Sequence, residues 1–207
     1  MPLKLTLGTQ TFGSDTNINA SYDILNYAYE NGIRSIDTAE RYPFPETEEK
    51  FGMTEKIIGK WINYNKIKRN EITVASKVTG RSDVNWKILG KGRLNKNRIK
   101  TALYKSLERI KLDFLDIYYL HWPDRYTNTF GRIFYDPDPD PIFIKFEEQC
   151  EALIELIQEG VIKNIGLSNE TPWGIMSFQN ILKANGYKVS FLQNEYSLLN
   201  RDFERSH

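Results

Sequence analysis

The chain has 207 residues, of which 40% are hydrophobic and 27% are charged, and its formal net charge is +1. This composition is typical of one globular domain with a well-buried core. The near-neutral charge gives no electrostatic reason to expect nucleic acid or an anionic membrane as a partner. There is no apolar run of about 18 residues, and the polar start lacks the apolar stretch of a signal peptide. We therefore expect a cytoplasmic protein.

Cysteine and histidine are scarce in this chain. Cys150 is the single cysteine, so an intrachain disulfide is excluded and a reducing compartment is expected. It lies in a helical pattern, which favours a packed thiol over a reactive one. With His121 and His207 as the two histidines, no histidine-based metal cluster can be assembled, and we expect no metal site.

Short apolar or β-branched runs alternate with helical patterns along the chain. The predicted strands are residues 5–11, 35–38, 72–77, 115–121, 163–168 and 189–194. The predicted helices are residues 20–31, 53–64, 97–111, 144–159 and 172–185. Gly32, Gly160 and Gly186 follow three of these helices as C-terminal caps, and Thr171-Pro172 is a favourable helix start.

Because each strand precedes a helix, right-handed crossovers would build a parallel sheet that curves toward a barrel. The α/β pattern covers residues 1–207 as one domain. Two long loops, residues 80–95 and 122–141, leave the carboxyl ends of strands, where barrel active sites lie. Such loops are either lids and pocket walls or solvated connectors.

Three polar residues end successive predicted strands: Asp37, Lys77 and His121. Neighbouring strands in a sheet lie about 4.8 Å apart, so these side chains should converge on one edge. Tyr42 follows Asp37 by five residues and can fold back over the same place. Together they would form a proton-transfer site. Taken singly, each has a simpler explanation: a strand-end cap, a snorkelling lysine, a core histidine or a turn residue.

Six segments occur in the order found in the aldo-keto reductase superfamily: GTQTFG (8–13), IDTAERYP (36–43), ASKV (75–78), LHWP (120–123), IGLSNE (165–170) and QNEYSLLNR (193–201). The chain most closely resembles the Tas-type branch, which includes relatives of potassium-channel β subunits. The resemblance covers nearly the whole chain.

This resemblance implies a TIM-type (β/α)8 barrel truncated to about six βα units, with strands 7 and 8 absent. A closed barrel of this type has eight strands, so we expect an open sheet that can self-associate through its edges. The resemblance also implies NADP(H)-dependent reduction of small aldehydes or ketones. In that reaction Tyr42 would donate the proton, Lys77 and Asp37 would adjust the pKa of Tyr42, and His121 would orient the carbonyl oxygen. We expect the Lys77 ammonium to lower the pKa of Tyr42.

The expected cofactor residues also follow from the resemblance. Segment 8–13 lacks the middle glycine of a Rossmann fingerprint, so NADP(H) would lie across the barrel mouth instead. Ser168, Asn169 and Gln193 would bind the nicotinamide carboxamide, although capping is a simpler role for Asn169 and Gln193. The remaining predicted cofactor residues are Gly8, Thr9, Gln10 and Asp37.

Aromatic residues near the mouth are candidates for the substrate pocket: Phe12, Trp86 and Trp122, with Tyr42 beside them.

The sequence leaves two other functions open. One is a nucleotide-sensing regulatory subunit, and the other is a catalytically inactive fragment of a reductase. Because the residues that grip the cofactor 2′-phosphate would belong to the absent part, we expect weakened NADP(H) binding.

Overall fold

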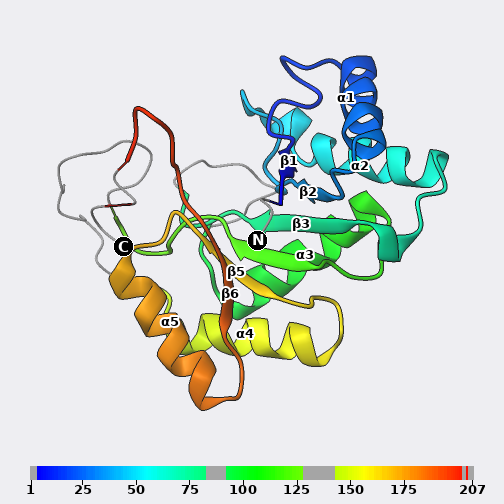
Figure 1. The fold of residues 1–207 in the computed structure, drawn as a ribbon. Helices are drawn as coiled ribbons and strands as arrows, with labels where there is room; N and C mark the ends of the chain where they lie inside the picture. Colours follow the sequence, from blue (N-terminus) through cyan, green and yellow to red (C-terminus); the bar gives the residue numbers. More distant parts are fainter. Residues whose placement is uncertain (1–3, 83–91, 128–142, 202–203, 205–207) are drawn as a thin grey trace.

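The protein is described by a computed structural model for residues 4–82, 92–127, 143–201 and 204. Its centre is one parallel sheet whose six strands follow the order of the chain (Figure 1). The strands are β1 (Thr6–Gly8), β2 (Ser35–Asp37), β3 (Thr73–Val78), β4 (Ile117–Leu120), β5 (Ile165–Ser168) and β6 (Val189–Gln193).

The described residues form five α-helices that alternate with these strands: α1 (Ile18–Glu30), α2 (Met53–Tyr64), α3 (Lys96–Ile110), α4 (Phe146–Gln158) and α5 (Pro172–Ala184). Short 3-10 helices, η1 (Glu48–Lys50) and η2 (Arg69–Glu71), precede α2 and β3. Figure 1 shows α1 and α2 at one end of the curved sheet and α4 and α5 at the other. The six predicted strands and the alternating helices are confirmed, with differences of a few residues at their ends.

Local sequence signals set the helix ends. Thr171 accepts a hydrogen bond from the Gly174 amide, and Pro172 occupies the first turn of α5. The chain turns away after α1 at Gly32, whose φ of +84° is a left-handed conformation that favours glycine. The predicted caps at Gly160 and Gly186 likewise have positive φ.

The main core lies between the sheet and its helices. It includes Ile58 and Trp61 of α2, Leu103 of α3 and Leu153 of α4, all at most 3% exposed. Cys150 is fully buried in this core, and burial raises the pKa of its thiol to about 12. It is therefore a packed thiol, as its helical context predicts.

The opposite, concave face of the sheet has a small separate cluster of Ala75, Ile117 and Tyr119. Successive residues of a strand point to opposite faces, so Lys77 shares a face with Ala75, and His121 shares a face with Tyr119. This alternation brings polar residues to the carboxyl edge of the concave face.

The described sheet ends at β1 and β6, which do not pair with each other. Both strands are less buried than β4 and β5, and Phe191 of β6 is 42% exposed. The open, TIM-type arrangement expected from the sequence is confirmed. No described helix has the length and apolarity to cross a bilayer. The described residues also contain no metal-binding group of three or more His, Cys, Asp or Glu side chains.

Candidate active site

The four predicted catalytic residues lie together at the carboxyl edge of β2, β3 and β4. In the parallel register Gly8 pairs with Asp37, and Lys77 pairs with Tyr119. His121 follows β4 directly, and its amide donates to the Val78 carbonyl at 2.9 Å. The sheet register therefore brings Asp37, Lys77 and His121 to one place.

Lys77 forms a buried ion pair with Asp37. Its Nζ lies 2.6 Å from Asp37 Oδ2, and it also donates to the Thr38 carbonyl at 2.8 Å. Lys77 is 0% exposed and Asp37 is 7% exposed. Burial lowers the pKa of Lys77, and the Asp37 charge opposes that shift. The pair thus keeps an ammonium in a position where burial alone would disfavour it.

Tyr42 lies above this pair and against His121. The Lys77 Nζ is 4.9 Å from the centroid of the Tyr42 ring, and the Tyr42 and His121 rings meet edge to face at 5.6 Å. Tyr42 reaches this position because its amide donates to the Ala39 carbonyl in a turn after β2. The predicted cluster of carboxylate, ammonium, phenol and imidazole is therefore present.

The expectation that the pKa of Tyr42 is lowered is wrong. Burial and the nearby charge of Asp37 raise the pKa of Tyr42 well above its ordinary value. The ammonium is close to the ring, but desolvation of the phenolate is the larger effect because most of the ring is enclosed. Tyr42 therefore holds its proton at neutral pH.

His121 is held in its neutral form. Burial, followed by the charges of Lys77 and Arg41, lowers its pKa well below the ordinary value. The side chain is 8% exposed, and its Nδ1 has no hydrogen-bond partner among the described residues. A neutral imidazole donates one hydrogen bond and accepts another, so His121 can hold a polar substrate atom without adding charge.

A cavity of about 350 Å³ opens beside Tyr42 and His121. Its lining residues are Gln10, Arg41, Tyr42, Pro43, Phe44, Glu46, His121 and Trp122. Trp122 is held there because its indole N–H donates to the Arg81 carbonyl at 2.6 Å. Gly80 permits the close approach, since a Cβ at this position would lie 2.1 Å from the Trp122 carbonyl oxygen.

The predicted pocket aromatics have different outcomes. Trp122 lines the cavity, whereas Trp86 falls outside the described residues. Phe12 does not line the cavity: it is 3% exposed and packs in the main core. Its assignment to the pocket is corrected, because the chain turns at Phe12 and directs the ring toward the helices.

Sequence reasoning missed four lining residues on the loop after β2: Arg41, Pro43, Phe44 and Glu46. They belong to the segment around Tyr42 and were not considered for the pocket. Arg41 directly precedes Tyr42, and Glu46 follows it by four residues. The signal available was the opposite charge of Arg41 and Glu46 on either side of the candidate proton donor.

Three of the predicted cofactor residues, Gly8, Thr9 and Gln10, lie at the end of β1. The ideal Cβ position of Gly8 has no heavy atom within 4 Å, so space is open above it. Gln10 is exposed and lines the cavity. Thr9 is fully buried, and its hydroxyl donates to the Asp37 carbonyl at 2.8 Å. Thr9 therefore supports Asp37 from below.

The residues expected at the carboxamide lie beside His121. Ser168 and Gln193 are register partners at the ends of β5 and β6, and the Asn169 amide donates to the Gln193 carbonyl at 3.0 Å. The side-chain amide of Asn169 donates to the His121 carbonyl at 2.9 Å and to Ser168 Oγ at 3.2 Å. These contacts place all three residues at the same edge as the catalytic candidates.

Comparison of the sequence with known proteins identifies the family. The model of the Aldo/keto reductase family matches residues 4–206. The chain belongs to this family. It is 39% identical over 202 residues to Protein tas of Escherichia coli K12, a match that covers 97% of this chain and 58% of the relative. It is also 32% identical over 207 residues to the uncharacterized oxidoreductase YrpG of Bacillus subtilis, covering 97% of this chain and 56% of that protein.

A solved structure supports the same fold. The thermostable aldo-keto reductase Tm1743, crystallised with the inhibitor epalrestat, superposes with a TM-score of 0.70 at 25% identity. The match covers 99% of this chain and 62% of that one. The chain thus spans a little over half the length of the relatives it matches, and its parallel sheet resembles that of Tm1743.

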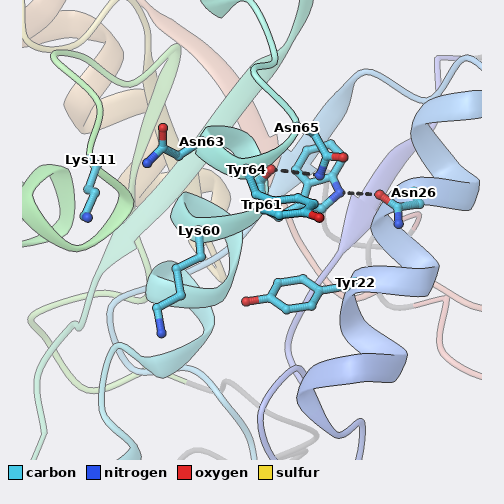
Figure 2. A pocket seen from close by; sticks show the side chains of 8 residues that line it. All are labelled: Tyr22, Asn26, Lys60, Trp61, Asn63, Tyr64, Asn65 and Lys111. Carbon is cyan, nitrogen blue, oxygen red and sulfur yellow. Dashed lines mark hydrogen bonds between the residues drawn. The ribbon is translucent and has the colours of Figure 1, made fainter.

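A larger cavity, of about 490 Å³, lies away from this edge, between α1 and α2 (Figure 2). Figure 2 shows Tyr22 and Asn26 of α1 facing Trp61 of α2, where the indole N–H donates to Asn26 Oδ1 at 2.7 Å. Lys60 and Lys111 lie near the carboxyl ends of α2 and α3, where cations offset the helix dipole. Its lining contains no carboxylate or histidine, in contrast to the cavity beside Tyr42 and His121.

Proposed function

We propose that this protein is an oxidoreductase that reduces aldehyde or ketone carbonyls to alcohols with NADP(H). The observation that carries the proposal is the buried Lys77–Asp37 pair beneath Tyr42 and His121, at the wall of an open cavity. A proton donor, its charged neighbour and a hydrogen-bonding imidazole are the groups that carbonyl reduction requires of the protein.

Each residue has a role that follows from its surroundings. Tyr42 holds a proton at neutral pH and would give it to the substrate oxygen. An alkoxide is a stronger base than a phenolate, so this transfer remains favourable even with the raised pKa of Tyr42. The Lys77 ammonium, 4.9 Å from the ring centroid, stabilises the phenolate that results. Neutral His121 would hold the carbonyl oxygen by a hydrogen bond.

The residues at the edge of β1 and β2 fit a bound cofactor. Asp37 Oδ1 is buried and has no hydrogen-bond partner among the described residues, although its other oxygen binds Lys77. Such an acceptor suits a ribose hydroxyl, and the open space above Gly8 admits a ring beside it. NADPH, when bound, supplies the hydride, which no side chain can provide. Asn169, Ser168 and Gln193 would hold the carboxamide.

The test is NADPH oxidation with 4-nitrobenzaldehyde as substrate, on the parent chain and on Tyr42→Phe. The substitution removes the proton donor and should lower turnover by about 10²- to 10⁴-fold. Cofactor binding, followed by NADPH fluorescence, should be retained. Tyr104→Phe removes a hydroxyl from the outer face of α3 and is the matched control. Equal turnover in Tyr42→Phe and the parent would remove Tyr42 from the reaction.

A further inference from the structure

An ion pair forms part of the wall of the active-site cavity. Arg41 and Glu46 both line this cavity, together with Tyr42 and His121. The Nε and Nη2 of Arg41 both donate to the carboxylate of Glu46. This two-point arrangement matches the fork of a guanidinium to one carboxylate, so Glu46 occupies the place that a second carboxylate would need.

The two partners differ in how firmly they are held. The Arg41 side chain is 10% exposed, its Nη1 donates to Ser82 Oγ at 3.3 Å, and its guanidinium lies 5.3 Å from the centroid of the Trp122 ring. The Glu46 side chain is 29% exposed, and its carboxylate contacts Arg41 among the described residues. Arg41 is thus held by several neighbours, whereas Glu46 can be substituted with little effect on the position of Arg41.

The charge of Arg41 reaches the position where a carbonyl would bind. After burial and Lys77, Arg41 is the third influence that lowers the pKa of His121. Phe44 and Trp122 line the same cavity and offer flat apolar surfaces to an aromatic substrate. A carboxylate on such a substrate would meet a guanidinium that is already neutralised, with the Glu46 carboxylate beside it.

We propose that Arg41 and Glu46 set the charge preference of this cavity: Glu46 neutralises Arg41 and makes the site select uncharged aromatic aldehydes over those that carry a carboxylate. This inference rests on the proposed function for the identity of the site. It has a direct consequence. Removing the charge of Glu46 takes this counter-charge away from the buried Arg41 guanidinium, and the preference should change toward acidic aldehydes.

The experiment compares 4-carboxybenzaldehyde with its methyl ester, a pair that differs by one negative charge. Affinities of the parent chain and of E46Q are measured by ligand-observed NMR, which does not depend on turnover. The parent should bind the ester more tightly. In E46Q the acid-to-ester affinity ratio should rise by about 10- to 100-fold, since a new charge-assisted hydrogen bond becomes available to the acid.

Two further variants isolate the cause. In the double variant R41M/E46Q the gain should disappear, because the guanidinium is no longer there. Glu30→Gln, on α1 and outside the cavity lining, removes the same charge and should leave the ratio unchanged. If E46Q does not fold, Glu46→Ala serves instead: it also removes the negative charge, so the ratio should rise in the same direction.

An unchanged ratio in E46Q, or a gain that persists in R41M/E46Q, would overturn the inference. So would failure of both aldehydes to bind to any variant. Failure of the proposed function is a separate result: no NADPH oxidation by the parent would reject the reductase activity, while the affinity ratios would still decide the role of Arg41 and Glu46.

Discussion

Lys77 Nζ lies 2.6 Å from Asp37 Oδ2, and Lys77 is completely enclosed by the protein. The second oxygen of Asp37 is buried without a hydrogen-bond partner among the described residues. A buried carboxylate that uses one oxygen for an ammonium and leaves the other open is not explained by stability alone, because an unsatisfied acceptor is costly. This unpaired acceptor supports the proposed contact between Asp37 and a bound cofactor.

Lys77→Met should destabilise the fold, because it leaves the Asp37 carboxylate buried without its cation. The expected loss is about 3–5 kcal/mol of unfolding free energy, measured by urea denaturation. Asp37→Asn in the same chain should restore much of this loss, since the double variant contains no unpaired charge. Equal stability of the single and double variants would mean that the ion pair does not hold this edge together.

Gly8→Ala should separate cofactor binding from folding. Its Cβ would meet no protein atom within 4 Å, so the unfolding free energy should change by less than about 0.5 kcal/mol. NADPH affinity, measured by fluorescence titration, should fall by about tenfold or more because the methyl group fills the space left for the ring. Undiminished affinity in Gly8→Ala would place the cofactor elsewhere.

Gly80→Ala is the contrasting substitution. A Cβ at this position would lie 2.1 Å from the Trp122 carbonyl oxygen, so the backbone after β4 has to move. The expected cost is about 1–3 kcal/mol in thermal or urea unfolding. If Gly80→Ala were as stable as Gly8→Ala, the close packing of the segment after β3 against the segment after β4 would not be supported.

The protein should lose stability in acid through an ion-pair network between α3 and α4. Hydrogen bonds from Lys100 are the first cause of the lowered pKa values of Glu155 and Glu159. A carboxyl group with a lowered folded-state pKa adds stability above its unfolded value of 4.5, and this stability is lost as the pH falls below that value. The melting temperature should therefore decrease between about pH 5 and pH 3.

Lys100→Met should make the decrease of the melting temperature in acid smaller, because the carboxylates of Glu155 and Glu159 then titrate closer to their ordinary range. Lys60→Met removes an exposed lysine from α2 and is the control with the same change of charge. An acid loss of equal size in both variants would assign the pH dependence to other groups.

The edges of the sheet should promote self-association. In the described part of the chain, β1 and β6 each pair with a single neighbour, and Phe191 of β6 is 42% exposed. Unpaired strand edges are templates for pairing with another chain. Sedimentation velocity should show species larger than a monomer at micromolar concentration. Phe191→Lys should reduce them, whereas Tyr27→Lys, on the exposed face of α1, should not.

Much of this protein could be predicted from its sequence because the signals are local. Alternating apolar runs gave the six strands, and caps such as Thr171 and Gly32 gave the helix ends. The convergence of Asp37, Lys77 and His121 also followed, since polar residues at the carboxyl ends of parallel strands must meet at one edge.

Other properties depended on the tertiary structure. Phe12 was expected in the pocket but packs in the core, because sequence does not show to which side a turn directs a ring. The pKa of Tyr42 is raised instead of lowered, because the balance between burial and charge depends on how closely the neighbours enclose the phenol. The pairing of Arg41 with Glu46 likewise required the loop to close on itself. Strand order and polarity are encoded locally, whereas desolvation and ion pairing are set by distances between side chains that only the folded chain establishes.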